Sequence, residues 1–208
     1  MSIINVVGAK IWGGGEQYVY DICKQLQQRH RTAYILVDQS NEDMQSRYAQ
    51  VGHVMTANLY TLKGFLSVNA VAKQMKEQGI NTIVCHSGKY ILFCIALKQL
   101  TGAKLVFIKH NLVPGKTDIY HRWINAQVDA FVCVSKLVYD DLMTPAIKDT
   151  SKYHVVYNGI DPNRFQSFSD AVPMKYKVRT FGYSARITER KGLYLILRSE
   201  ERRVGKEC

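Results

Sequence analysis

Short apolar runs alternate along the chain with segments of helical periodicity, and this alternation restricts the fold more than any other feature. Runs typical of buried strands occupy residues 2–7, 32–38, 81–87, 103–111, 129–135 and 153–161, with a shorter one at 52–57. Helical spacing of apolar residues marks 16–28, 64–79, 88–102, 118–127 and 136–143. Apolar strands joined by helices predict βαβ units and a parallel sheet covered on both faces. The predicted fold is therefore α/β, with a doubly wound, Rossmann-like sheet.

The sequence changes in character after residue 160. Residues 161–177 are polar and hold two of the four prolines, whereas residues 178–197 begin a new strand, loop and helix. We therefore predict a Rossmann-like domain over 1–160 and a linker over 161–177. Residues 178–197 would be the first βα unit of an incomplete second Rossmann-like domain.

The last eleven residues, 198–208, break the pattern because their one aliphatic residue is Val204. One reverse translation of this tail reads like the start of a common sequencing adapter. Our hypothesis is that the tail is non-native and that it cuts short a longer protein. Genomic DNA that encodes these residues would refute the hypothesis, and a genuine polar C-terminal helix is the alternative.

The net charge of +11 over 208 residues favours anionic partners, namely nucleic acid, phosphorylated ligands or an anionic membrane surface. The charges are scattered, however, so a basic solvated surface explains them equally well. The sequence shows no signal peptide and no apolar run near 18 residues long. Its five cysteines lie far apart, which favours buried thiols in a reducing cytoplasm over a zinc site or disulfides.

The stretch "GAKIWGGGEQYVYDI" joins the first predicted strand to the first predicted helix. It does not fit the dinucleotide fingerprint, because Tyr18 stands where the last glycine is required. It does not fit a P-loop either, because Gly14 replaces the lysine. What remains is a flexible loop at a helix N-terminus that would admit a phosphate or a sugar hydroxyl close to the backbone. A tight strand-to-helix turn is the alternative.

Polar residues follow several predicted strands, where ligands bind in a doubly wound sheet. They occupy Gly13–Glu16, His86–Gly88, Lys109–Asn111, Ser135–Lys136 and Asn158–Gly159. Two histidines at strand ends, His86 and His110, predict a polar edge more strongly than either would alone. Near the C-terminus, "SARITERKG" places Arg186, Arg190 and Lys191 at a loop and helix start, a combination suited to a diphosphate or to a solvated charge cluster.

Five segments, taken in order, resemble the retaining glycosyltransferases of the two-domain GT-B fold (group 1, family 4-like). They are "GGGEQYVYDICKQL", "FIKHN", "VCVSKLVYDDL", "VVYNGIDPNRF" and "GYSARITERKGLYLIL". The resemblance spans residues 5–197. It implies a first domain that binds the acceptor and a second that binds a nucleotide-diphosphate sugar. The activity implied is sugar transfer in polysaccharide, lipopolysaccharide or glycolipid synthesis.

The resemblance also implies roles for individual residues. His110 would be the catalytic residue, a hydrogen-bonding or charge-stabilising group beside the transferred sugar. The donor diphosphate would be bound by Arg186, Lys191, Gly14 and Gly15, and the basic pair would neutralise the leaving group.

Two further residues, Glu16 and His86, are expected on the acceptor side. No metal and no cofactor is expected. The implied partners are a nucleotide sugar, a saccharide or lipid-linked acceptor, and an anionic membrane surface, with no nucleic acid. The expected location is the cytoplasm, peripheral at the inner membrane.

The chain departs from the family pattern in two places. Ala185 stands where the family usually has glycine before Arg186, and the chain ends before the family's Glu-x7-Glu motif. We therefore expect this chain to be inactive and its longer parent to be a transferase.

Two other function classes stay open at this stage. A non-catalytic sugar- or nucleotide-binding module would have a true stop codon after Leu197, whereas a downstream Glu-x7-Glu would favour the enzyme. A nicotinamide-dependent oxidoreductase is weakly supported, because its fingerprint is missing and Asp38 is its one candidate ribose ligand. Calorimetry with a nicotinamide dinucleotide against uridine diphosphate would separate these classes.

Overall fold

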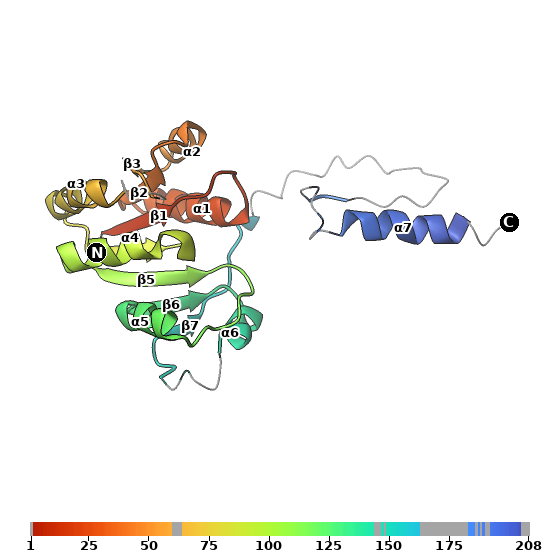
Figure 1. Ribbon diagram of the computed structural model, residues 1–208. Helices are drawn as coiled ribbons and strands as arrows, with labels where there is room; N and C mark the ends of the chain where they lie inside the picture. Colours follow the sequence, from red (N-terminus) through yellow and green to blue (C-terminus); the bar gives the residue numbers. More distant parts are fainter. Residues whose placement is uncertain are drawn as a thin grey trace. The chain divides into compact units, whose positions relative to one another are not determined.

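The computed structural model describes residues 2–59, 64–143, 147, 149–162, 183–185, 187, 189 and 192–204. The chain divides into two units, Met1–Ile160 and Asp161–Cys208, both drawn in Figure 1. We describe each unit by itself.

The first unit is built on a seven-stranded sheet in the order β3-β2-β1-β4-β5-β6-β7, in which all neighbours pair in parallel. From β1 the chain winds outward to β3, then returns to β4 beside β1 and winds outward in the other direction. The predicted doubly wound, Rossmann-like fold is thereby confirmed. The strands are β1 (Ile3–Val7), β2 (Ala33–Asp38), β3 (His53–Ala57), β4 (Thr82–Cys85), β5 (Lys104–Lys109), β6 (Ala130–Cys133) and β7 (Tyr153–Val155).

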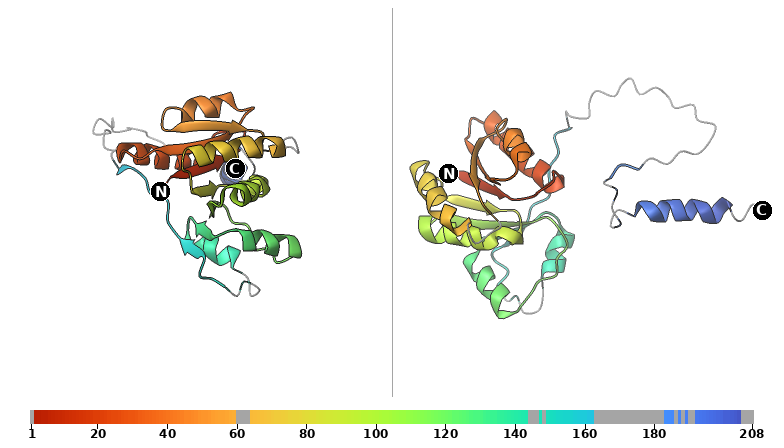
Figure 2. Two further views of the ribbon diagram at one scale, coloured as in Figure 1. Left: turned by 90° about the vertical axis from the view of Figure 1, so that its left-hand side faces the viewer. Right: turned by 45° about the horizontal axis from the view of Figure 1, so that its top comes forward.

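Helices cover both faces of this sheet (Figure 2). One face carries α1 (Gly14–Gln28) and α2 (Glu42–Tyr48), and the other carries α3 (Gly64–Glu77), α4 (Ile91–Thr101), α5 (Ile119–Gln127) and α6 (Lys136–Leu142). Strand residues alternate between the two faces, so Leu36 joins one core and its neighbours Ile35 and Val37 join the other. Burying both faces explains why the strands are apolar throughout.

Glycines end two of the helices where the sequence predicts it. Gly79 follows α3 with φ +63°, and Gly102 follows α4 with φ +72°. Both values lie in the left-handed region, which glycine enters without steric cost and which commonly ends a helix. The helix predicted at 88–102 begins in the structure with a short 3₁₀ turn, η1 (Gly88–Tyr90), which α4 follows.

The structure also differs from the predicted elements at helix α2 and at the last strand. Helix α2 was not predicted, because only Met44 and Tyr48 of its seven residues are buried and its other residues are polar. Asn41 begins this helix, and its Oδ1 accepts a hydrogen bond from the Met44 N–H at 3.1 Å. The last predicted strand, 153–161, is shorter than expected. β7 ends at Val155 because its neighbour β6 ends at Cys133, the residue paired with Val155.

In the second unit the structure describes helix α7 (Leu193–Val204), which Gly192 precedes with φ +72°. The helix extends into the segment 198–208, whose origin therefore stays a hypothesis. Most of the predicted linker and the start of the predicted strand at 178 lie outside the described residues. Among the described helices, none combines the length and the apolar character needed to cross a bilayer.

Candidate ligand-binding site

Three loops with predicted site residues leave the carboxyl-terminal edge of the sheet at its topological switch point. β1 and β4 are neighbours from which the chain winds in opposite directions, and ligands of open α/β sheets bind beside such a point. The glycine-rich loop follows β1, His86 follows β4 and His110 follows β5. Tertiary structure therefore brings these three predicted features to one edge.

His86 and His110 are hydrogen-bonded to each other. Nδ1 of His86 lies 3.0 Å from Nε2 of His110. The two rings are 5.3 Å apart between centroids and inclined by 23°. They meet because β4 and β5 pair with Cys85 opposite Phe107, so that both strands deliver a histidine to the same edge. Each imidazole is half-buried.

Asn5 and Tyr18 complete a group that we call the histidine site (Asn5, Tyr18, His86 and His110). Oδ1 of Asn5 lies 3.1 Å from Nε2 of His86, and Asn5 itself is only 3% exposed. The ring of Tyr18, on α1, stands edge-on to both imidazoles, at 5.2 Å from His110 and 6.2 Å from His86. The histidine site thus joins β1, α1 and the loops after β4 and β5.

Burial lowers the pKa of both imidazoles and so favours their uncharged forms. Desolvation, with a smaller contribution from the neighbouring His110, lowers the pKa of His86 to about 3. Desolvation also lowers the pKa of His110. Each neutral ring has one N–H and one bare nitrogen, so it can donate one hydrogen bond and accept another. Such a pair suits ligand hydroxyl groups better than it suits an anion.

The glycine-rich loop is anchored on both sides before it reaches α1. Nδ2 of Asn41 donates hydrogen bonds to the carbonyl oxygens of Ala9, at 2.9 Å, and Lys10, at 3.3 Å. The indole Nε1 of Trp12 donates to Oε1 of Gln17 at 3.2 Å. These contacts hold the loop backbone in a defined position at the start of the helix.

Nothing among the described residues requires glycine at positions 14 and 15. Neither residue has a left-handed backbone, and a Cβ added at either would meet no described atom within 4 Å. Both open helix α1, where alanine would be the more favourable residue by up to about 1 kcal/mol. They lie three and four positions before Tyr18, and therefore on its face of the helix. Their bare backbone N–H groups point out of the helix N-terminus and are available to a ligand.

The other predicted site residues differ in how the structure places them. Glu16 lies in the first turn of α1, where a carboxylate suits the helix dipole. Its carbonyl oxygen accepts a hydrogen bond from the Tyr48 hydroxyl at 3.0 Å. Arg186 and Lys191 lie outside the described residues. Their predicted contact with a donor diphosphate therefore remains a prediction.

Ser135 and Lys136, at the next strand end, serve the local structure. The Ser135 hydroxyl accepts a hydrogen bond from the Val138 N–H at 3.2 Å and so caps α6. Nζ of Lys136 lies 2.9 Å from Oδ1 of Asp140, one helical turn away. Both residues have a structural explanation, unlike Gly14 and Gly15.

The carboxylate of Asp38, the candidate ribose ligand of an oxidoreductase, already accepts hydrogen bonds from neighbouring residues. Its Oδ1 accepts a hydrogen bond from the Ser40 N–H at 3.0 Å, and its Oδ2 accepts one from the Leu59 N–H at 2.9 Å. Burial acts to raise the pKa of this carboxyl, but the hydrogen bonds from Ser40 and Leu59 outweigh it and lower the pKa overall. The carboxylate thus organises the turn after β2, which weakens the oxidoreductase alternative.

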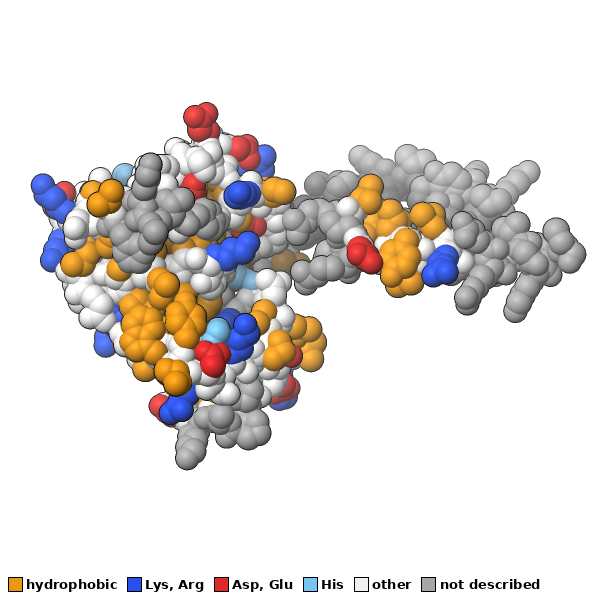
Figure 3. Space-filling model, in the orientation of Figure 1, with side chains coloured by type: hydrophobic (Ala, Val, Ile, Leu, Met, Phe, Trp, Pro, Cys, Tyr) orange, Lys and Arg blue, Asp and Glu red, His pale blue; other side chains and the backbone are white. Residues whose placement is uncertain are grey.

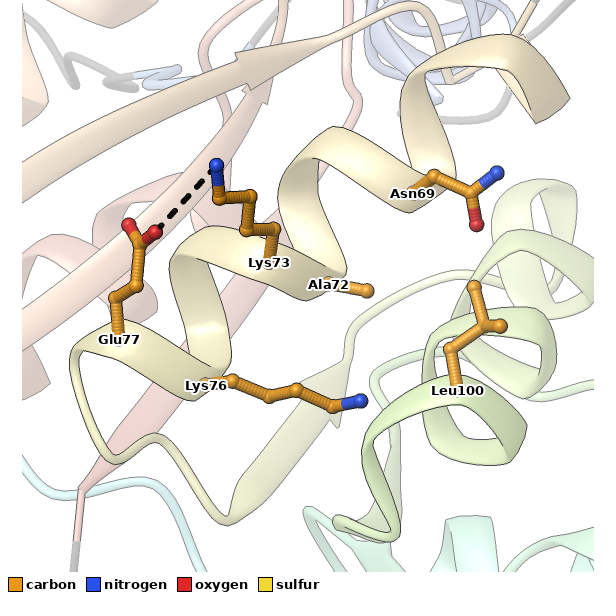
Figure 4. Close-up of a pocket in the computed structure, with 6 residues that line it drawn as sticks. All are labelled: Asn69, Ala72, Lys73, Lys76, Glu77 and Leu100. Atoms are coloured by element: carbon orange, nitrogen blue, oxygen red, sulfur yellow. Dashed lines mark ion pairs between the residues drawn. The ribbon is translucent and has the colours of Figure 1, made fainter.

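A surface pocket of about 310 Å³ lies elsewhere, between the C-terminal ends of α3 and α4 (Figure 4). Lys73 and Glu77 form an ion pair across one turn of α3 at 3.9 Å, and Lys76 and Leu100 also line the pocket. Helices of βαβ units run opposite to the strands, so this pocket opens at the sheet edge away from the histidine site. Within the described part of the chain, no cluster of His, Cys, Asp and Glu is placed to hold a metal ion.

The sequence prediction missed two residues of the histidine site. Asn5 was included in an apolar strand and Tyr18 in the apolar stripe of the first helix. Asn5 carries a detectable signal, since it is the one strongly polar side chain within the run "IINVV". Tyr18 carries none, because an aromatic residue on an amphipathic helix is ordinary.

The parallel, doubly wound sheet with helices on both faces defines a Rossmann-like domain. Residues 12–164 match the model of Glycosyltransferase Family 4, and the chain belongs to this family. Comparison with curated proteins finds no significant match.

Three solved structures illustrate the likeness in fold. A glycosyltransferase from Rickettsia africae ESF-5 superposes with a TM-score of 0.69 at 19% identity, covering 79% of this chain and 45% of that one. HepE from Anabaena, solved with UDP-glucose, gives 0.61 at 19% identity over 78% of this chain and 45% of its own. The lipopolysaccharide outer core galactosyltransferase WaaB gives 0.55 at 14% identity, over 77% and 46%. At these identities the likeness establishes the fold, and this chain spans less than half the length of each structure.

Proposed function

We propose that this chain is the acceptor-side part of a retaining glycosyltransferase. The enzyme would transfer a sugar from a nucleotide-diphosphate sugar to a saccharide or lipid-linked acceptor during surface polysaccharide or lipopolysaccharide synthesis. Membership of Glycosyltransferase Family 4 supports the reaction class. The likeness in fold to HepE, which was solved with UDP-glucose, supports a nucleotide-sugar donor.

One observation carries the proposal, namely the bare backbone at Gly14 and Gly15 beside the histidine site. No contact with the described residues requires glycine there, so we assign the missing side chains to a ligand that comes close to the backbone. A diphosphate fits this position, because backbone N–H groups and a helix dipole attract negative charge. The neutral His110 would then hydrogen-bond the transferred sugar.

We assign the remaining donor contacts to Arg186 and Lys191 on the family resemblance alone. A guanidinium and an ammonium would neutralise the charge that develops on the departing diphosphate. Glu16, near the same loop, is assigned to the acceptor side. The proposed reaction uses no metal.

The test of this function is a transfer assay on the proposed full-length protein, whose reading frame genomic sequencing of the locus would supply. We expect release of the nucleoside diphosphate from one of UDP-glucose, UDP-galactose, UDP-N-acetylglucosamine or GDP-mannose when a saccharide or lipid-linked acceptor is added. The anomeric coupling constant of the product, measured by ¹H NMR, should show retention. Binding of a donor without turnover would favour the non-catalytic module, and an inverted product would exclude the retaining mechanism.

We further propose that the first unit docks on an anionic membrane through α5, at the cytoplasmic face of the inner membrane. Hydrophobic side chains gather over α5 (Figure 3). The most exposed on the helix are Ile119 at 85%, Tyr120 at 50% and Trp123 at 47%. Lys116 and Arg122, both exposed, flank them, and the chain as a whole carries +11. Aromatic and basic residues together suit the headgroup region of an anionic bilayer.

Sedimentation with vesicles of phosphatidylcholine, with and without phosphatidylglycerol, tests this docking surface. We expect binding that depends on the anionic lipid and weakens about tenfold or more in the Tyr120→Ser, Trp123→Ser double variant. Burial of each large apolar side chain is worth about 1.5–3 kcal/mol. Leu66→Ser is the matched control, because Leu66 is 81% exposed on a different helix. Equal binding to both vesicle types, or equal loss in the control, would refute the surface.

A further inference from the structure

A chain of hydrogen bonds runs from the buried thiol of Cys23, next to the histidine site, through Asn5 and His86 to His110. Nδ2 of Asn5 lies 3.9 Å from Sγ of Cys23, Oδ1 of Asn5 lies 3.1 Å from Nε2 of His86, and Nδ1 of His86 lies 3.0 Å from Nε2 of His110. The four residues come from β1, α1 and the loops after β4 and β5. The proposed transfer reaction assigns no role to Asn5, Cys23 or the contact between the histidines.

The direction of each hydrogen bond follows from the first one. The amide nitrogen of Asn5 faces the sulfur of Cys23 and donates a weak hydrogen bond to it. Burial raises the pKa of Cys23 to about 12, so the thiol is uncharged. The Asn5 oxygen therefore faces His86 and accepts a proton donated by Nε2. A neutral His86 that holds its proton on Nε2 has a bare Nδ1, which accepts from Nε2–H of His110.

His110 is thereby left with its proton on Nε2 and a lone pair on Nδ1. Among the described residues, none hydrogen-bonds this Nδ1, and Tyr18 lies edge-on to the ring at 5.2 Å between centroids. We infer that Asn5 and His86 are positioning residues that fix one tautomer of His110, so that its Nδ1 accepts a hydrogen bond from a hydroxyl group of the sugar. This inference rests on the proposed function for the identity of the ligand.

Two physical consequences distinguish this arrangement from a lone histidine. The imidazole of His110 would keep its tautomer and its ring orientation when the ligand binds, because the hydrogen bond at Nε2 has already fixed the tautomer and the orientation. The chain would also be polarised in one direction, which strengthens each hydrogen bond in it. A ligand amine or hydroxyl group could donate a hydrogen bond to Nδ1, whereas a carbonyl oxygen, which has no hydrogen to donate, could not.

The tautomers can be measured directly by long-range ¹H–¹⁵N NMR of the 208-residue chain labelled with ¹⁵N-histidine, at pH 7.5. We expect both rings to carry the proton on Nε2, with assignments taken from the signals lost in His86→Ala and His110→Ala. In Asn5→Leu and His86→Ala, His110 should become a mixture of tautomers. In His86→Asn it should keep the Nε2–H form, because the amide oxygen replaces Nδ1 as the acceptor. His154→Ala, on the exposed part of β7, is the control.

A proton on Nδ1 of His110 in the unsubstituted chain would overturn the inference without any variant. So would a His110 tautomer that His86→Ala leaves unchanged.

Kinetics of the proposed full-length transferase separate this inference from the proposed function. Asn5→Leu and His86→Ala should lower kcat about tenfold with the donor KM nearly unchanged, as expected for loss of one positioning hydrogen bond, and His86→Asn should restore most of the loss. If the unsubstituted enzyme turns over no donor, the proposed function fails while the NMR result stands. If His110→Ala leaves turnover intact, the contact between His110 and the sugar fails. If His110→Ala abolishes turnover and His86→Ala does not change it, the positioning role fails instead.

Discussion

Replacement of His110 by alanine in the proposed full-length transferase is expected to lower kcat about 100-fold, the usual cost of removing one hydrogen-bonding group from a transition state. The donor KM should change only a few-fold, because the diphosphate contacts are assigned to other residues. Steady-state release of the nucleoside diphosphate, measured with the preferred donor, gives both constants. We expect a larger change in kcat than in the donor KM because the imidazole is proposed to contact the transferred sugar.

His154→Ala is the control for this experiment, because His154 is exposed on β7 and belongs to no proposed site. It should leave kcat unchanged. Urea unfolding of both variants would show that the alanine substitutions leave the fold intact. Turnover by His110→Ala equal to that of the unsubstituted enzyme would remove His110 from the active site.

A pair of glycine substitutions should have opposite effects on stability and on activity. Gly52→Ala is expected to lower the free energy of unfolding of the 208-residue chain by about 1–3 kcal/mol, the usual cost of overpacking. Its new Cβ would lie 2.5 Å from Cδ1 of Ile35 and 2.7 Å from the carbonyl oxygen of Ala33. The end of the isoleucine can move aside, but the carbonyl belongs to the paired strand β2 and cannot.

Gly15→Ala should leave the free energy of unfolding unchanged or raise it by up to about 1 kcal/mol, because the new Cβ meets nothing and alanine favours the helix. In the proposed full-length transferase, the same substitution should raise the donor KM, since the methyl group would stand where the diphosphate is proposed to lie. Urea titration followed by circular dichroism measures the first effect, and kinetics the second. A loss of stability in Gly15→Ala as large as that in Gly52→Ala would make Gly15 structural and remove the main support for the donor site.

The proposed membrane surface on α5 and the histidine site belong to the same unit of the chain. The exposed aromatic residues of α5 follow the loop after β5, and His110 begins that same loop. The vesicle experiment and the kinetic experiment test the two features independently.

The alternation of apolar strands and amphipathic helices was enough to predict the doubly wound sheet. Burial on both faces imposes a local pattern, so each strand and most helices can be recognised from a few neighbouring residues. Gly79 and Gly102 are equally local signals, because a left-handed residue at a helix end depends only on the helix that it closes. Helix α2 escaped detection because only two of its side chains are buried.

The sequence by itself also determined that His86 and His110 follow strands, and therefore that both face the ligand-binding edge. Only the tertiary structure decided that they contact each other, that Asn5 lies behind them and that Tyr18 covers them. His86 and Asn5 are 81 positions apart, and they meet because β1 and β4 are neighbours in the sheet. A hydrogen bond of this kind depends on strand order and register, which are set by packing across the whole domain. No pattern within a short stretch of sequence records them.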